Sequence, residues 1–419
     1  MAALALAALA VSGVAAHPPA YHGKGSAPQP QEPNVNTATA ASDVYAAQAT
    51  AASTAQTSHV HGAAFDRFIT IWLENTDFDK AAGDPNLAWL ATQGITLNNY
   101  FGVTHPSEPN YVAAIGGDNF GMDNDDFNQI EGNVSTVIDL LEARGISWAS
   151  YQEDMPYTGF EGMGWVNQST KKNDYVRKHN PPVIYDANTT PQRLSQQKNT
   201  TLFYDDLAAR NLPQWSFITP NMTSDGHDTS VTVAGTWTRA FLEPLLKNDY
   251  FMKRTLILVT FDENHTYTLA NRVFSILLGG AVAGQEGTTD SSYYNHYSEI
   301  ATVEANWGLD TLGRWDVGAN VFAHVAAQTG DRVRANDAVA GANPTVFQNS
   351  SFAGPFNDGF AQAGYPAPNT TLVSPNGRRH VLPAIVAQYA GVQNETYYNA
   401  TVAIPDGRHP PAGYAVNPK

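Results

Sequence analysis

The feature that most constrains the fold is a series of short apolar runs that alternate with helical patterns along the chain. Each run is rich in β-branched and aromatic residues and has no polar face, which is typical of strands buried on both sides of a parallel sheet. The runs are FITIWL (68–73), ISWASY (146–151), WSFIT (215–219), TLILVTF (255–261) and VFSILLG (273–279). Helical patterns cover 134–144, 202–210 and 231–246. This alternation predicts an α/β fold with a mostly parallel sheet sandwiched between helices.

Composition divides the rest of the chain. Residues 1–16 contain an apolar run that ends in small residues, which is the pattern of a signal peptide cleaved before His17. Residues 17–64 are rich in Ala, Thr, Ser, Gln and Pro, which predicts a flexible arm. We expect one main domain over 65–345 with a loop-rich insertion over 152–200, and a C-terminal extension over 346–419 that packs on this domain or trails it.

Overall composition excludes several classes of protein. Hydrophobic residues make up 42% of the chain and charged residues 15%, which excludes an intrinsically disordered protein. With 23 basic and 39 acidic residues the net charge is −16, so we expect no nucleic-acid partner. The chain has no cysteine, which excludes disulfides and thiol nucleophiles. After the leader, no run reaches the roughly 20 apolar residues that span a bilayer, and we expect a secreted protein, extracellular or in the cell wall.

Asn-x-Ser/Thr sequons agree with export. Such sequences are glycosylation acceptors in secreted proteins, where the sugars add solubility. We expect a glycoprotein modified at Asn133, Asn167, Asn188, Asn199, Asn221, Asn264, Asn349, Asn369, Asn394 and Asn399.

Polar clusters directly follow three of the predicted strands. They are Glu74-Asn75, Asp262-Glu263-Asn264, and the segment 220–228 with Asp225, His227 and Asp228. Ligands of open α/β sheets bind outside the carboxyl ends of the strands. Acids carried to one edge repel each other unless protons or a cation neutralise them. The sequence therefore predicts a metal site at this edge.

A separate element begins with Ser107-Glu108-Pro109-Asn110 and runs to Gly116-Gly117. It predicts a helix with Ser107 at the N-cap, Pro109 in the first turn and glycine after the end. The unpaired N–H groups of a first turn, together with the helix dipole, bind anions. A hydroxyl at this position lies beside a bound phosphate, and a neighbouring cation would lower its pKa enough for attack. Ser107 is therefore either a helix cap or a nucleophile.

These motifs resemble the phosphoesterase family of acid phosphatases and phospholipases C, and within it the chain looks most like the fungal secreted acid phosphatases. The similar strings, in order over residues 65–330, are WLENTDFD, THPSEPNYVAAIGG, YVRKHNPP, ITPNMTSDGHD, VTFDEN and NHYSEIATVEANWGL. The resemblance implies an alkaline-phosphatase-like fold, with residues 65–345 as the catalytic phosphoesterase domain. Ser-x-Pro-Asn at 107–110 also resembles the Thr-x-Pro-Asn nucleophile element of nucleotide pyrophosphatases.

The resemblance implies roles for individual residues. Ser107 would be the nucleophile, with Asn110 and His179 as further catalytic residues. The substrate phosphate would be bound by Asn75, Lys178 and His227. The metal ligands would be Glu74, Asp225, Asp228, Asp262, Glu263 and His296. We expect His105, His265 and His324 to be structural.

The predicted site departs from the Asp-His pair that is frequent in alkaline-phosphatase relatives. Glu263 stands where the histidine would be, and this oxygen-rich site suits Mg²⁺, Mn²⁺ or Ca²⁺ better than zinc. Carboxylates with a pKa near 4 also stay ionised in acid, where imidazoles leave metals. Equally, protonated histidines would bind phosphate without a metal. The cofactor is thus a divalent metal or none.

The resemblance implies hydrolysis of small phosphate monoesters in two steps, through a phosphoserine on Ser107. One alternative is a phospholipase C or other phosphodiesterase, which would need an apolar groove. Either that groove or, equally, the core of the insertion would be formed by Met155, Tyr157, Phe160, Met163 and Trp165. A second alternative is a catalytically inactive secreted binding protein. The RHGxRxP signature of histidine acid phosphatases and the GxSxG elbow of α/β-hydrolases are both absent.

Overall fold

The computed structural model describes residues 36–360, 364–391 and 396–414. The expected signal peptide and residues 17–35 of the expected arm lie outside this range. None of the described helices has the length and apolar character needed to cross a bilayer.

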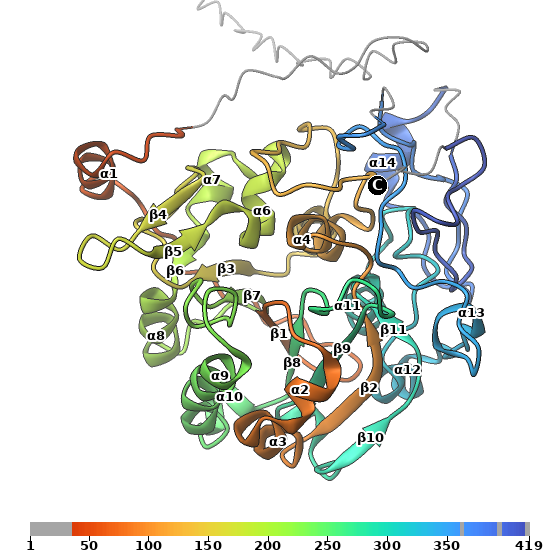
Figure 1. Ribbon diagram of the computed structural model, residues 1–419, viewed down its shortest axis with the longest axis horizontal. Coiled ribbons are helices and arrows are strands. Elements are labelled where there is room, and N and C mark those ends of the chain that lie inside the picture. The colour runs from red at the N-terminus through yellow and green to blue at the C-terminus, as the bar shows by residue number, and fades with distance from the viewer. Residues whose placement is uncertain (1–35, 361–363, 392–395, 415–419) are drawn as a thin grey trace, which may run out of the picture.

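A nine-stranded sheet forms the centre of the molecule, in the order β10-β2-β9-β8-β1-β7-β3-β6, with β11 paired to β2 (Figure 1). The strands are β1 (Arg67–Leu73), β2 (Ile95–Phe101), β3 (Trp148–Gln152), β6 (Gln197–Asn199), β7 (Trp215–Thr219), β8 (Thr255–Phe261), β9 (Arg272–Leu278), β10 (Thr288–Asp290) and β11 (Tyr294–Asn295). Their pairings are parallel except for those of β9, which is antiparallel to β8 and β2. Residues 262–271 between β8 and β9 are too few for the crossover that parallel strands require. The predicted, mostly parallel sheet is confirmed.

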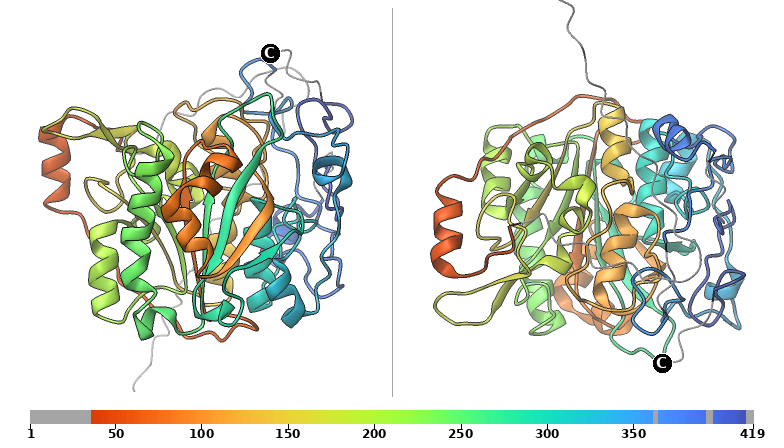
Figure 2. Two further views of the ribbon diagram at one scale, coloured as in Figure 1. Left: turned by 60° about the horizontal axis from the view of Figure 1, so that its bottom comes forward. Right: turned by 90° about the horizontal axis from the view of Figure 1, so that it is seen from above.

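Helices cover both faces of this sheet, as predicted. Figure 1 shows α2 (Phe78–Gly83), α3 (Pro85–Ala91) and α9 (Val231–Leu245) on one side. On the other side lie α4 (Ser107–Gly116) and α11 (Tyr297–Trp307), and the views of Figure 2 agree. The remaining α-helices are α1 (Ala41–Gln48), α5 (Val137–Ala143), α6 (Pro181–Ile184), α7 (Pro191–Leu194), α8 (Thr200–Ala208), α10 (Asp249–Met252), α12 (Ala323–Thr329), α13 (Asp337–Ala340) and α14 (Pro383–Gln388).

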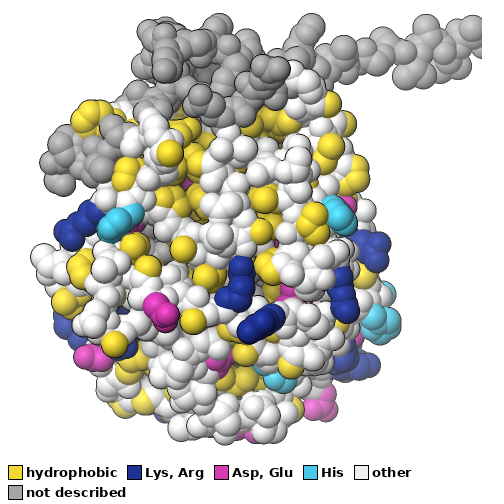
Figure 3. Space-filling model, turned by 90° about the vertical axis from the view of Figure 1, so that its right-hand side faces the viewer, with side chains coloured by type: hydrophobic (Ala, Val, Ile, Leu, Met, Phe, Trp, Pro, Cys, Tyr) yellow, Lys and Arg dark blue, Asp and Glu magenta, His cyan; other side chains and the backbone are white. Residues whose placement is uncertain are grey.

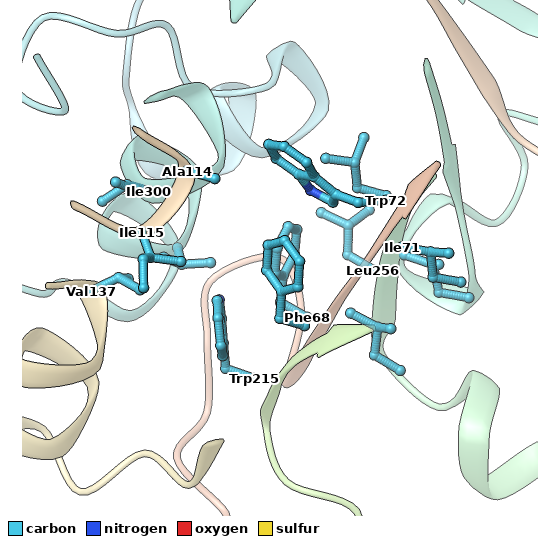
Figure 4. Close-up of a cluster of buried hydrophobic side chains, with 14 of the residues drawn as sticks. Phe68, Ile71, Trp72, Ala114, Ile115, Val137, Trp215, Leu256 and Ile300 are labelled. Carbon is cyan, nitrogen blue, oxygen red and sulfur yellow. The ribbon is translucent and has the colours of Figure 1, made fainter. Parts of the chain in front are cut away.

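The core between the sheet and α4 fixes the position of that helix. Phe68 and Trp72 of β1 point toward Ile115 of α4 and Ile300 of α11, and Trp215 of β7 lies beside them (Figure 4). All five side chains are buried, and burying a large apolar side chain stabilises the fold by roughly 1.5–3 kcal/mol. The helix that carries Ser107 is therefore held rigidly against the central strand.

Residues 36–64, which we expected to belong to a flexible arm, instead pack on the domain. They include α1 and a segment bonded to residues near the start of β7. Ser58 Oγ donates to Gln214 Oε1 (2.6 Å), and Gln214 Nε2 donates to Val60 O (2.8 Å). Val44 of α1 is buried against Phe160 and Trp165. Low complexity did not predict this contact, because hydroxyl and backbone groups make most of it.

The insertion and the C-terminal extension both contact the segments around the central sheet. The insertion contains the hairpin β4 (Gly164–Val166) and β5 (Asn173–Val176), the 3₁₀ turn η1 (Arg177–His179) and edge strand β6. Further 3₁₀ turns are η2 (Asp186–Asn188) and η3 (Gly280–Val282). In the extension, Tyr397 and Tyr398 donate to Asp118 Oδ2 (2.6 and 2.7 Å), so it packs on the domain. Figure 3 shows this side of the molecule, where charged side chains are sparse.

Candidate active site

Ser107 is the first residue of α4. The N-cap is Pro106, and Ser107 does not cap the helix, so the helix-cap interpretation is wrong. Its Oγ instead donates to Glu74 Oε2 (3.1 Å) and lies 3.4 Å from Asn75 Oδ1. The helix ends at Gly116 and is capped by Gly117, whose φ of 75° is the left-handed conformation that glycine adopts easily. The hydroxyl therefore faces the carboxyl end of β1.

The three polar clusters meet at the carboxyl ends of their strands, as predicted. Parallel pairing places Leu73 of β1 opposite Phe261 of β8, so the residues after them are neighbours. Asn75 N donates to Asp262 Oδ1 (3.1 Å), and Asn75 Nδ2 donates to Glu263 Oε1 (2.9 Å). The third cluster, which contains Asp225, is bonded to the first through the backbone: Glu74 N donates to Asp225 O (3.0 Å).

A buried ion pair forms where the insertion reaches this edge. His179 Nε2 lies 2.9 Å from Glu74 Oε1, and His179 Nδ1 lies 3.3 Å from Asp225 Oδ2. The ring also stacks on Tyr111, whose hydroxyl donates to Glu74 Oε1 (2.9 Å). Thr219 Oγ1 donates to His179 O (2.9 Å), which fixes η1 against β7. His179 thus stands between two carboxylates from different strands.

The electrostatics of this pair are set by burial and by mutual attraction. Burial alone would raise the pKa of Glu74, but the adjacent His179 lowers this pKa to about 2. Burial alone would lower the pKa of His179, but Glu74 and Asp225 raise it to about 9. Burial raises the pKa of Asp225 to about 6, with Glu74 acting in the same direction. At mildly acidic pH the pair is therefore a carboxylate and an imidazolium.

Asp262 and Glu263 are buried acids with few counter-charges. Burial and the charge of Glu74 raise the pKa of each carboxyl well above its usual value. Glu263 Oε2 lies 2.6 Å from His105 Nδ1, and burial lowers the pKa of that histidine to about 3, so its ring is neutral. Within the described residues, Asp262 Oδ2 has no hydrogen-bond partner. A cation would take the place of the protons that these acids otherwise hold.

One group of side chains has the arrangement of a metal site. Glu74, His179 and Asp225 each offer a ligand atom, and these atoms lie within 4.8 Å of one another. Within the described residues, His179 Nε2 and Asp225 Oδ2 have no partner with hydrogen-bond geometry, although both lie at ion-pair distance from their neighbours. A cation would take both of these buried atoms as ligands, with His179 in its neutral form, so this Glu-His-Asp group can hold a metal ion.

Other predicted ligands are not brought into this cluster. His296 Nε2 lies 2.5 Å from Asp262 O and its Nδ1 lies 3.4 Å from Tyr100 Oη, so neither ring nitrogen faces the carboxylates. Asp228 lies at the surface and pairs with His227 Nδ1 (2.9 Å). The ligand roles expected for His296 and Asp228 are not met, because their polar atoms are engaged elsewhere.

The remaining predicted residues lie around the site. The Asn110 amide is occupied by the loop before α4, since it accepts from Val103 N (2.9 Å) and donates to Thr104 O (2.9 Å). It therefore holds this loop, and its Nδ2 also lies 3.4 Å from Glu263 Oε2 in the site. The His227 ring lies 6.0 Å from that of His179 and is exposed.

Lys178 is mostly buried and forms an ion pair with Asp125 (2.8 Å). Glu74 and Asp125 hold the pKa of its ammonium group above the usual value, although burial opposes them.

Sequence reasoning missed two residues of the site. Tyr111 lies one turn after Ser107 on α4, so its spacing alone would have placed it on the same face. Asp125 comes from the loop after α4, and nothing in its local sequence indicated a contact with Lys178.

The histidines expected to be structural behave differently from one another. His105 is buried at the site beside Glu263, and its ring stacks on Tyr267 at 3.7 Å. His265 is exposed. His324 is half-buried in α12, where its Nε2 lies 2.8 Å from Ala281 O.

The sequons differ in accessibility. Asn188 and Asn264 are buried, at 0% and 2% exposure, so the folded chain has no room for a glycan at either. Asn399 is exposed, and Asn394 lies outside the described residues. The other sequon residues are half-buried: Asn133, Asn167, Asn199, Asn221, Asn349 and Asn369.

Comparison with known proteins identifies relatives. Over 275 residues the chain is 59% identical to an acid phosphatase of Aspergillus fumigatus, a match that covers 65% of this chain and 62% of the relative, less than two thirds of its length. Over 350 residues it is 50% identical to a probable acid phosphatase of Kluyveromyces lactis, covering 82% of this chain and 81% of that protein.

A solved structure of an alkaline phosphatase superfamily protein from Vibrio parahaemolyticus is similar, with a TM-score of 0.38 and 10% identity. The similarity covers 62% of this chain and 73% of that one. Residues 82–310 match the model of the Phosphoesterase family. The chain therefore belongs to the Phosphoesterase family, which confirms the resemblance that its motifs indicated.

Proposed function

We propose that the chain is a secreted acid phosphatase that hydrolyses small phosphate monoesters through a phosphoserine on Ser107. The observation that carries this proposal is the Ser107 hydroxyl at the start of α4, hydrogen-bonded to Glu74 among the acids that end β1 and β8. Relatives named as acid phosphatases, at 59% to 47% identity, support the reaction class. The leader pattern at residues 1–16 supports export.

In the proposed mechanism Glu74 orients the nucleophile. Ser107 Oγ attacks phosphorus in line, its proton leaves toward Glu74 Oε2, and the bond from phosphorus to the leaving oxygen breaks. The leaving oxygen takes up a proton from solvent. Water then attacks the phosphoserine, which releases phosphate and restores the hydroxyl. Positioning and neutralisation of charge supply most of the acceleration of such transfers.

Positive charge at the site would come from one of two alternative sources, because a protonated histidine cannot bind a metal. The protonated His179 lies between Glu74 and Asp225 and balances part of their charge. A divalent cation held by Glu74, His179 and Asp225, with Asp262 beside them, would lower the pKa of the Ser107 hydroxyl and neutralise the phosphoryl oxygens. Because oxygen donors prevail, we propose Mg²⁺, Mn²⁺ or Ca²⁺ rather than zinc.

The arrangement of the insertion does not provide the apolar groove that the phosphodiesterase alternative was expected to use. Met155, Phe160 and Trp165, expected to line a groove in a phosphodiesterase, are buried in a small core with Val44 and Tyr175. Of the same set Met163 is exposed, and Tyr157 packs on this core. Because these side chains pack α1 against the hairpin, they do not line an apolar groove at this place.

The proposal is tested with Ser107→Ala and a matched control, Ser216→Ala. Ser216 is also a buried serine, on β7, and its Oγ has no hydrogen-bond partner within the described residues. We expect the Ser107 variant to lose phosphomonoesterase activity at least about 1,000-fold, as removal of other nucleophiles does, and the control to keep it. Full activity of Ser107→Ala would refute the mechanism. Wild-type preference for a diester would refute the substrate class, and no turnover of either would favour the binding protein.

A further inference from the structure

Two groups that would bind the substrate phosphate are already bonded to a carboxylate. Asp125 Oδ1 accepts a hydrogen bond from Glu108 N (2.9 Å), and Asp125 Oδ2 lies 2.8 Å from Lys178 Nζ. Glu108 N belongs to the first turn of α4, next to Ser107, and Pro109 after it has no N–H. The two carboxylate oxygens of Asp125 therefore bind the N–H of Glu108 and the ammonium group of Lys178, as two oxygens of a phosphate would.

The difference in exposure between Asp125 and Lys178 makes this occupation reversible. The Asp125 side chain is 30% exposed, whereas that of Lys178 is 12% exposed. The carboxylate can therefore rotate into water, while the ammonium group of Lys178 stays in place and pairs with the incoming phosphate.

The loop that carries Asp125 is held by the C-terminal extension. Asn124 Nδ2 donates to Phe356 O (3.1 Å), and Asn357 Nδ2 donates to Gly121 O (3.0 Å). A Cβ on Gly121 would lie 2.7 Å from the backbone of Gly354, so the two segments are in direct contact. Because this backbone is anchored, the exchange of ligands takes place at the Asp125 side chain.

We propose that Asp125 is a built-in competitor of phosphate: in the free protein its carboxylate occupies Glu108 N and Lys178, and a phosphate ester binds by displacing it. This inference rests on the proposed function. Two consequences follow from the shared donors. Asp125 raises the KM for the ester, and it promotes release of product phosphate by returning to the groups that phosphate leaves.

The test compares Asp125→Asn with Asp126→Asn, a neighbouring exposed acid, in the full-length protein with its metal content unchanged. The dissociation constant of inorganic phosphate is measured by calorimetry, together with KM and kcat for a monoester. We expect Asp125→Asn to bind phosphate about 2- to 5-fold more tightly, the range set by breaking a partly exposed ion pair, with a lower KM and no gain in kcat. Asp126→Asn should match the wild type.

If Asp125 instead only positions Lys178, its variant would bind phosphate as weakly as the wild type or more weakly, which overturns the inference. Asp125→Ser, checked for folding by its melting temperature, serves if the asparagine variant is unstable. The experiment distinguishes failure of the proposed function from failure of the inference about Asp125. A wild type that neither binds phosphate nor turns over a monoester overturns the proposed function and the inference together, whereas an active wild type with no tightening in the variant overturns the inference alone.

Discussion

Replacement of His179 by glutamine should destabilise the protein in a pH-dependent manner. The substitution leaves a polar side chain of similar size but removes the positive charge between Glu74 and Asp225, where the histidine side chain is 3% exposed. A buried carboxylate deprived of its partner is costly, because little water reaches it. The substitution therefore measures the strength of the ion pair at the centre of the site.

The magnitude can be worked out from either partner. The pKa of Glu74 falls from 4.5 to about 2, and the pKa of His179 rises from 6.5 to about 9. Each change is equivalent to about 3 kcal/mol, and because both describe the same attraction they are not added. The stabilisation from Glu74 is present above pH 4.5 and lost as pH falls through 2, whereas that from His179 is present below pH 6.5 and lost as pH rises through 9. The full effect is thus expected between pH 4.5 and 6.5.

Urea unfolding of the chelator-treated protein provides the assay. At pH 5.5 we expect His179→Gln to lower the free energy of unfolding by about 3 kcal/mol, and at pH 9.5 by less than half of that. His324→Gln is the control, since it replaces a histidine whose Nε2 contacts the carbonyl oxygen of Ala281 outside the site. If His179→Gln lowered the free energy of unfolding equally at pH 5.5 and pH 9.5, the ion pair would not be the source of the stabilisation.

Two further predictions concern the metal and the glycans. Chelation should reduce phosphatase activity and the melting temperature, and Mg²⁺ or Mn²⁺ should restore both better than Zn²⁺. If metal analysis finds no cation and chelator leaves the activity unchanged, no metal is needed, and protonated His179 alone balances the charge of the acids. Peptide mass spectrometry of the secreted protein should find glycan at Asn399 but none at Asn264, whose side chain is 2% exposed. A glycan on Asn264 would contradict the buried position of that loop.

The sheet was predictable to the extent that its strands are buried on both faces. The apolar runs at β1, β7 and β8 have no other stable environment, and the structure contains all of them. Strand β2 was missed because ITLNNYF interrupts its apolar residues with two asparagines that are half-buried. The antiparallel direction of β9 follows from the short 262–271 connection, which sequence periodicity does not register.

The candidate site was predictable where it follows from strand ends. Glu74, Asp225 and Asp262 come together because parallel strands bring their carboxyl ends to one edge. The contacts of His296 with Asp262 O and of Asp125 with Lys178 depend on how distant segments pack, and no local pattern specifies them. For the same reason, no role in the site could be predicted from the sequence of the C-terminal extension, although this extension anchors the loop that carries Asp125.

The central claim, that the phosphoryl group passes through Ser107, is tested most directly by the stereochemistry at phosphorus. The wild type is given a monoester whose phosphate is made chiral with three oxygen isotopes, in the presence of an alcohol acceptor, and the transferred phosphate is analysed by NMR. Each in-line displacement inverts the configuration, so attack by Ser107 followed by attack of the acceptor predicts overall retention. Overall inversion would mean a single direct displacement and would contradict the account.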